Sequence, residues 1–291
     1  MTTVRRQLFC WRLLWLAVLP ATIVSAEETL FSRVAEEDQQ PLALQLAIAS
    51  YVPRSGDRSI QIDLVSAIHI GDAEYYHDLN ARFESYDALL YELVAPKDTV
   101  VSGSDNESRG VISSTQIGMK NLLNLSFQLD EIDYSPSNFV HADLSPTELS
   151  DSMDARGESL YVYFWRLFYA SVDEYTKDPL GLKNWEMMSA MMSADSDHAF
   201  KTILAYEMTD LSKHSQILGE DSESAIIGAR NQRAVDVLKN QLAAGDKRIA
   251  IFYGVAHMPD MEERLVEQLD LIYLDTTWVD AWRLDTRIDI K

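Results

Sequence analysis

The alternation of apolar and polar positions in the first part of the chain predicts a β-hairpin, a helix and a further strand. Residues 42–51 are mostly apolar, and residues 59–68 alternate before they become continuously apolar, as a strand entering a core does. Pro, Gly and Asp within 53–57 predict the turn between them. A helix over 73–85 and an apolar strand over 88–94 follow. This order indicates an α/β fold whose mixed central sheet opens with a β-hairpin and carries helices on its faces.

The second half of the chain continues this plan. Ser145 and Glu148, with a proline after the serine, give the clearest helix start, because they combine an N-cap with a capping box. Asp72 can cap the earlier helix. The other predicted elements are a helix over 115–129, a strand over 138–143, helices to about 215, a helix over 222–244 closed by Gly245, a strand over 248–253, a helix over 259–269 and closing strands over 271–274 and 276–284. We therefore predict a single α/β domain over 27–291 with a helical insertion over about 115–220.

The first 26 residues have the features of a secretory signal peptide. Arginines without any acid precede a short apolar segment over 13–24, and small residues lead up to Ala26. We predict cleavage after Ala26 and a periplasmic or secreted protein, with an uncleaved anchor as the alternative. Cys10 is the only cysteine, so the processed chain would have neither a disulfide nor a thiol nucleophile. Export without disulfides favours a bacterial periplasm.

The chain is strongly acidic. It has 25 basic and 46 acidic residues, which give a formal net charge of −21. Such a surface repels nucleic acids and anionic membranes, so we expect no nucleic-acid partner. After residue 26 no apolar segment of the sequence reaches the length of a membrane span, so we expect no stable membrane insertion once the signal peptide is cleaved.

Three polar residues stand at the ends of predicted apolar strands. His69 and His257 each follow a strand and small residues, and each precedes a helix start, while Glu92 ends the third strand. Ligands of open α/β sheets bind at the carboxyl ends of the strands. Two imidazoles and one carboxylate can bind a divalent metal such as Mn²⁺, Co²⁺ or Zn²⁺ and leave positions open for water and substrate. The alternative is that the histidines only pack at the ends of their strands.

These residues also carry a resemblance to a known family. The sequence resembles the TraB/PrgY/GumN family, which includes the Tiki proteins and belongs with the erythromycin-esterase-like group. Its two G-x-x-H motifs correspond to 254–257, which reads Gly-Val-Ala-His, and to 66–69, where Ser66 stands in place of Gly. Its Glu corresponds to Glu92, and its E-R-N segment corresponds to 229–231, where Ala229 replaces the acid. The resemblance implies a metal-dependent hydrolase, similar to a metalloprotease, with His69, Glu92 and His257 as the metal or catalytic set.

Four further residues are candidates for the chemistry. Arg230 can bind a carboxylate through two hydrogen bonds, hold Glu92 in place or hold the substrate, and Asn231 lies beside it. The alternative for Arg230 is an exposed helix arginine. His141 and Asp143 follow a short strand and can transfer a proton or supply a fourth ligand, or they can be an ordinary pair at a strand end.

Two functions follow from these residues. The first is an exported metal-dependent hydrolase of peptide or other amide bonds, in which a metal-bound water attacks the carbonyl group. The alternative is a non-catalytic periplasmic protein that binds or inhibits a peptide or small ligand, which the replacement at Ser66 favours. A purely structural domain is the third possibility, and the matched placement of the histidines argues against it.

Overall fold

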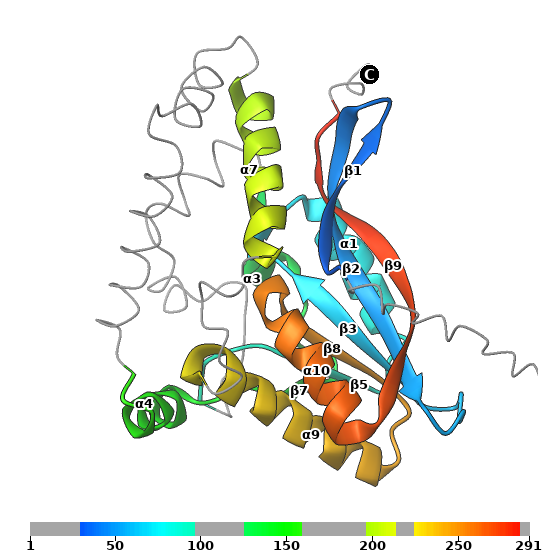
Figure 1. Cartoon of the computed structure of the whole chain (residues 1–291), viewed down its shortest axis with the longest axis vertical. Helices are drawn as coiled ribbons and strands as arrows, with labels where there is room; N and C mark the ends of the chain where they lie inside the picture. Colours follow the sequence, from blue (N-terminus) through cyan, green and yellow to red (C-terminus); the bar gives the residue numbers. More distant parts are fainter. Residues whose placement is uncertain (1–29, 97–124, 159–195, 214–223, 286–291) are drawn as a thin grey trace, which may run out of the picture.

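The structure is a computed structural model, and it describes residues 30–96, 125–158, 196–213 and 224–285 (Figure 1). The predicted signal peptide over 1–26 and most of the predicted helix over 115–129 lie outside the described residues. The predicted helical insertion is therefore described only in part.

One mixed sheet organises the described residues. The strands are β1 (Ser32–Glu37), β2 (Gln40–Pro53), β3 (Gln61–Ala67), β4 (Ile70–Gly71), β5 (Ala88–Tyr91), β6 (Ser126–Phe127), β7 (Phe139–His141), β8 (Arg248–Gly254) and β9 (Leu271–Arg283). The main sheet has the order β1-β2-β3-β8-β5-β7, and β9 also pairs with β2. The strands β3, β8, β5 and β7 are parallel, whereas β1, β3 and β9 each run antiparallel to β2. The predicted α/β fold, with its opening hairpin, is confirmed.

Helices cover both faces of this sheet. They are α1 (Ala73–Phe83), α3 (Gln128–Glu131), α4 (Pro146–Ala155), α7 (Ser196–Lys213), α9 (Arg230–Ala244) and α10 (Met258–Leu269), with a π-helical turn (Ala225–Ala229) before α9 and a 3-10 turn (Val255–His257) before α10. In Figure 1, α9 and α10 lie in front of the parallel strands and α1 lies behind them. None of the helices in the described ranges has the length and apolar character needed to cross a membrane.

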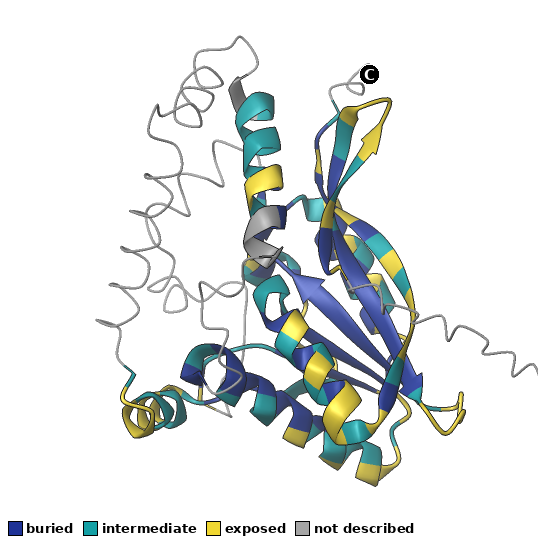
Figure 2. Cartoon of the chain, in the orientation of Figure 1, coloured by how far each residue is buried: buried dark blue, intermediate teal, exposed yellow. Residues whose placement is uncertain are grey.

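Side chains that alternate along the strands fill two cores. In β3, Ile62 and Leu64 pack into the core that α9 and α10 complete, whereas Val65 and Ala67 pack into the core that α1 completes. The adjacent strand β8 alternates in the same way. Since both faces of the parallel strands are buried, these strands are mostly apolar, and they appear almost entirely buried in Figure 2. This explains the continuous apolar runs in the sequence.

The predicted helix ends are confirmed at two places. The Ser145 hydroxyl accepts a hydrogen bond from the Glu148 N–H, and the Glu148 carboxylate accepts one from the Ser145 N–H, so the capping box forms at the start of α4. Gly245 ends α9 with φ of +106°, a conformation that glycine adopts without strain.

Asp72 does not cap α1 through its side chain, so that prediction is wrong. One of its carboxylate oxygens accepts a hydrogen bond from the Lys201 ammonium at 2.9 Å, and the other accepts one from the Arg283 backbone N–H at 2.6 Å. Asp72 therefore joins the start of α1 to α7 and β9. A long-range ion pair has replaced a local cap, which the sequence around the helix does not reveal.

Two strands differ from the prediction. β1 was not predicted, because its sequence is polar and its turn to β2 uses Asp38 and Gln39, which have positive φ angles without being glycine. The two closing strands predicted over 271–274 and 276–284 are one continuous strand, β9, and that prediction is wrong. An irregularity in the pairing with β2 near Asp275 interrupts the alternation of side chains there.

Asp63 is an unusual residue within the core-forming part of β3, since it is only 3% exposed. Its carboxylate accepts hydrogen bonds from the Tyr86 hydroxyl at 2.7 Å and from the Gln61 side-chain amide at 2.9 Å. A buried carboxylate needs such donors, because burial removes its water. Tyr86 thus connects the segment before β5 to the centre of the sheet.

We predict that Tyr86→Phe lowers the free energy of unfolding by about 1–3 kcal/mol, because the buried Asp63 carboxylate loses one donor. The matched control is Tyr206→Phe, which removes a hydroxyl that contacts Glu36 at the surface and should change stability by less than about 0.5 kcal/mol. Urea unfolding of both variants measures the difference. If Tyr86→Phe were as stable as Tyr206→Phe, the role given to Tyr86 would be contradicted.

Candidate functional site

The predicted site residues follow the carboxyl ends of the four parallel strands. His69 follows β3, Glu92 follows β5, Asp143 follows β7, and His257 follows β8 after one 3-10 turn. Pairing of these strands in parallel register brings their ends to one edge of the sheet. The helix α9 then contributes Arg230 to this edge. The edge is where open α/β sheets bind their ligands.

Arg230 is the centre of the group. Its Nε and Nη2 donate hydrogen bonds to the two carboxylate oxygens of Asp143 at 2.9 and 2.6 Å. Nη2 also donates to Oε1 of Glu92 at 2.7 Å, and Nη1 donates to Nε2 of His257 at 3.4 Å. The Arg230 side chain is only 10% exposed, and Asp143 is fully buried. The alternative of an exposed helix arginine is therefore wrong.

A backbone N–H group also holds the second carboxylate oxygen of Glu92. Its Oε2 accepts a hydrogen bond from the Gly254 N–H at 2.6 Å. A Cβ atom at Gly254 would lie 3.3 Å from this oxygen, so a glycine lets the backbone approach the carboxylate closely. Burial opposes ionisation of Glu92, but His257 in its protonated form, Arg230 and the Gly254 N–H stabilise the carboxylate and lower its pKa to about 2. Glu92 is therefore a carboxylate at neutral pH.

His257 has one defined tautomer. The Asn231 amide nitrogen donates hydrogen bonds to the His257 carbonyl at 3.0 Å and to Asp260 at 2.7 Å, so the Asn231 amide oxygen faces Nδ1 of His257 at 2.7 Å. Nδ1 must then carry the proton, and Nε2 presents a lone pair toward Glu92 and Arg230. Burial lowers the pKa of His257, and Arg230 acts in the same direction against the opposing effect of Glu92. His257 is therefore neutral at pH 7.

The remaining predicted residues lie beside this group. The His69 side chain is exposed, and its carbonyl accepts a hydrogen bond from the Gln128 N–H. Among the neighbours that lower the pKa of Glu92, His69 has the smallest effect. His141 instead directs Nε2 to the Leu93 carbonyl at 2.7 Å and stacks edgewise on Tyr91. No contact of His141 with Glu92, Arg230 or His257 is present in the described part of the chain.

The geometry bears on the predicted metal. Nε2 of His257 lies 3.7 Å from Oε1 of Glu92, but the Arg230 guanidinium contacts both of these atoms. A guanidinium in this position supplies the positive charge that a divalent cation would otherwise supply. Over the described ranges, no group of three or more His, Cys, Asp or Glu side chains is arranged to hold a metal ion. As arranged here the described donors do not form a metal centre, so the metal stays a prediction.

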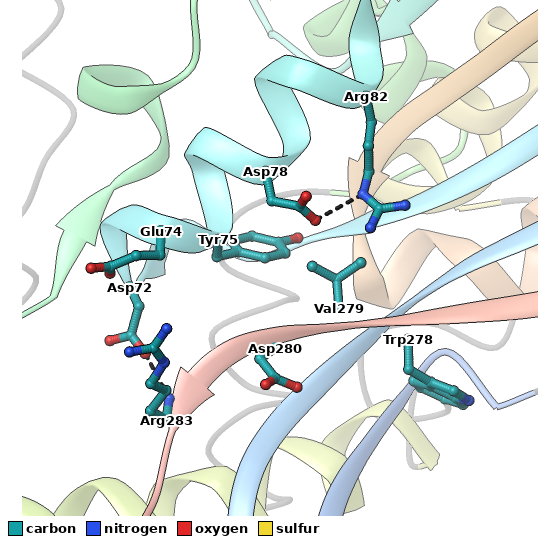
Figure 3. Close-up of a pocket in the computed structure, with 9 residues that line it drawn as sticks. All are labelled: Asp72, Glu74, Tyr75, Asp78, Arg82, Trp278, Val279, Asp280 and Arg283. Carbon is teal, nitrogen blue, oxygen red and sulfur yellow. Dashed lines mark hydrogen bonds and ion pairs between the residues drawn. The ribbon is translucent and has the colours of Figure 1, made fainter. Parts of the chain in front are cut away.

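A surface pocket of about 360 Å³ lies elsewhere, where α1 meets β9 (Figure 3). Its lining residues are Asp72, Glu74, Tyr75, Asp78, Arg82, Trp278, Val279, Asp280 and Arg283. Several of its acids already have partners, since Asp78 pairs with Arg82 at 2.8 Å and Asp72 accepts from the Arg283 N–H. It contains none of the seven residues predicted for the site, so we base no function on it.

Sequence reasoning missed the part of Asp260 in this site. From the sequence, Asp260 is an acid in the first turn of the helix after His257, where the helix dipole favours such a residue. In the structure it also accepts a hydrogen bond from Asn231 and pairs with Arg264 on the next turn of α10. The spacing of Asp260 and Arg264, four residues apart, is the one signal in the sequence that indicates this pair.

Comparisons with known proteins did not assign a family. No family model matches the sequence, and no match was found among curated proteins. The resemblance to the TraB/PrgY/GumN family therefore rests on the short motifs alone.

We predict that Arg230→Ala destabilises the fold by about 3–5 kcal/mol, because Asp143 and Glu92 would lose their shared cation while they remain buried. Arg233→Ala is the matched control on the same helix. Its ion pair with Glu148 is partly exposed, so its loss should reduce stability by about 1 kcal/mol or less. Chemical denaturation of both variants measures the difference, and a small effect at Arg230 would show that the buried cluster contributes little.

Acid should destabilise the protein in two ranges of pH. Neutral, buried His257 has a lowered pKa, so its contribution is complete above about pH 6.5 and declines as the unfolded chain gains a proton below that value. Ionised Glu92 contributes fully above about pH 4.5, and its contribution declines toward pH 2 by on the order of 3 kcal/mol. The free energy of unfolding, measured from pH 7 to pH 3, should therefore fall less steeply below pH 4.5 in Glu92→Gln than in the wild type. Parallel curves for the two proteins would contradict this assignment.

Proposed function

We propose that this chain is an exported hydrolase of amide or ester bonds, with peptides as the first substrate class to test. The observation that carries the proposal is the lone pair on Nε2 of His257. Asn231 fixes this tautomer, and the nitrogen faces a buried cation and a carboxylate at the ligand-binding edge of the sheet. The resemblance to the TraB/PrgY/GumN family implies the same class of reaction.

His257 would act as the general base. In the structure Nη1 of Arg230 contacts the Nε2 lone pair at 3.4 Å. Once Nη1 turned to the substrate oxygen, the neutral Nε2 would accept a proton from a water molecule, which then attacks the carbonyl carbon of the substrate. Glu92, with its oxygen 3.7 Å from Nε2, would stabilise the imidazolium ion that forms. The same imidazolium would then return the proton to the leaving amine or alcohol.

Arg230 would bind the negative charge that develops on the carbonyl oxygen. Its Nε and Nη2 are engaged by Asp143 and Glu92, whereas Nη1 makes one longer contact, with His257. Nη1 therefore has an N–H available for a substrate oxygen. A donor that is already fixed in place stabilises such charge without reorganisation. In this scheme Asp143 orients Arg230, and the earlier assignment of proton transfer to His141 or Asp143 is not needed.

Binding without turnover is the second candidate. The serine at position 66 favours it, because it departs from the first histidine motif, and so does the exposed side chain of His69, which lies outside the buried cluster. In the structure Ser66 is buried, and its hydroxyl has no hydrogen-bond partner among the described residues. A binding protein could use the same Arg230 to hold a carboxylate or carbonyl group of its ligand.

We predict that the protein produced from the full chain hydrolyses members of a fluorogenic peptide and ester panel. His257→Gln should lower kcat/KM by roughly 10²- to 10⁴-fold, the range for loss of a general base. His77→Gln, which changes an exposed histidine on α1, is the matched control and should keep full activity. Binding of a panel member without turnover would support the second candidate and contradict the hydrolase.

The same preparation tests the predicted metal and the predicted export. After incubation with Mn²⁺, Co²⁺ or Zn²⁺ and desalting, a bound metal that is lost in His69→Ala/His257→Ala would support the metal-dependent form of the hydrolase. Full activity without bound metal would contradict that form and leave the roles of His257 and Arg230 intact. Sequencing of the amino end tests cleavage after Ala26.

A further inference from the structure

Asn231 makes contacts that determine which way its side-chain amide faces. Its nitrogen donates to two acceptors, the carbonyl oxygen of His257 and the carboxylate of Asp260. In the reverse orientation, the amide oxygen would face these two oxygens and the nitrogen would face Nδ1 of His257. That orientation would favour a proton on Nε2 and remove the lone pair from the site.

Asp260 is itself firmly placed. Arg264 donates from Nε to one of its oxygens at 2.7 Å and from Nη2 to the other at 3.1 Å. Both side chains are largely buried, at 13% and 14% exposure. Arg264 also donates to the Gln232 side chain on α9 at 2.7 Å. Arg264, which belongs to α10 and also contacts α9, therefore holds the carboxylate that faces Asn231.

One oxygen of Asp260 has two donors. Asn231 and the Arg264 Nε both contact Oδ2, each at 2.7 Å, while Nη2 of Arg264 contacts Oδ1. An asparagine at 260 can place its single oxygen where Oδ2 lies and keep both of these bonds. An alanine keeps neither. The two substitutions remove the same charge and differ in the acceptor that they offer to Asn231.

We infer that Asp260 is a positioning residue, which acts through Asn231 to keep the proton of His257 on Nδ1 and the lone pair of Nε2 in the site. The effect of Asp260 on catalysis rests on the proposed function, whereas its effect on the tautomer does not. The contact of Asp260 with the histidine is indirect, since Asn231 lies between them. Arg264 supports the arrangement by fixing the carboxylate.

The test is nitrogen NMR of the full chain with ¹⁵N-labelled histidine, with the His257 signals assigned by their loss in His257→Gln. The wild type should show a protonated Nδ1 and an unprotonated Nε2. Asp260→Asn should keep this pattern, and Asp260→Ala should shift it toward the other tautomer. In the hydrolase assay, Asp260→Ala should lose roughly tenfold or more in kcat/KM while Asp260→Asn stays close to the wild type.

A rescue variant separates positioning from a general effect on folding. Asn231→Asp/Asp260→Ala places a carboxylate, which can only accept a hydrogen bond, directly against Nδ1 and should restore its proton. An unchanged tautomer in folded Asp260→Ala would overturn the inference, and so would loss of the wild-type tautomer in Asp260→Asn. If Asp260→Ala does not fold, the spectra of Asp260→Asn and of the double variant decide. The expected tautomers in a protein without hydrolase activity would contradict only the proposed function.

Discussion

A buried guanidinium shared by two carboxylates and one imidazole is the interaction on which the rest of the site depends. Arg230, Glu92 and Asp143 each have a side chain that lies mostly or wholly inside the protein. Any one of them alone would be strongly unfavourable there, since burial removes the water that stabilises a charge. Together they exchange that water for short hydrogen bonds. The group also joins α9 to the ends of β5 and β7, so the same contacts that arrange the site hold one helix against the sheet.

The cluster determines the state of His257 as well. Glu92 and Arg230 oppose each other in their effect on the imidazole, and burial then keeps it neutral. Asn231 decides which nitrogen carries the proton, and the adjacent position of Arg230 and Asn231 in α9 sends one side chain to the carboxylates and the other to the histidine. A single turn of helix thus controls both the charge around the base and the direction of its lone pair.

Much of this arrangement could be predicted from the sequence. The continuous apolar runs before His69 and His257 identify buried parallel strands, and topology then brings their carboxyl ends to one edge of the sheet. Gly254 is one of the small residues that precede His257 in the sequence, and the structure shows which group approaches it, the Glu92 carboxylate. Local pattern was sufficient here because a short, continuous apolar run is typical of a strand that is buried on both faces.

Other features depend on contacts that no local pattern records. Arg230 stands in a helix with many polar neighbours, so its burial follows only from the position of α9 against the sheet. Asp72 was predicted as a cap but pairs with Lys201, which lies 129 residues away. The strand β1 is polar and its turn lacks glycine, so neither of the usual signals was present. For Arg230 and Asp72 the deciding partners are distant in the sequence.

The same distances have a consequence for how the protein is made. Glu92 and Asp143 precede Arg230 by 138 and 87 residues, and Gly254 follows Glu92 by 162. A chain that emerges with its amino end first therefore carries both acids long before their cation, and they remain hydrated until α9 arrives. Contacts between such distant residues form slowly, because a long loop must close before they stabilise anything. A chain that ends before α9 lacks Arg230 and therefore lacks this charge arrangement. The arrangement can form only late in the synthesis and folding of the protein.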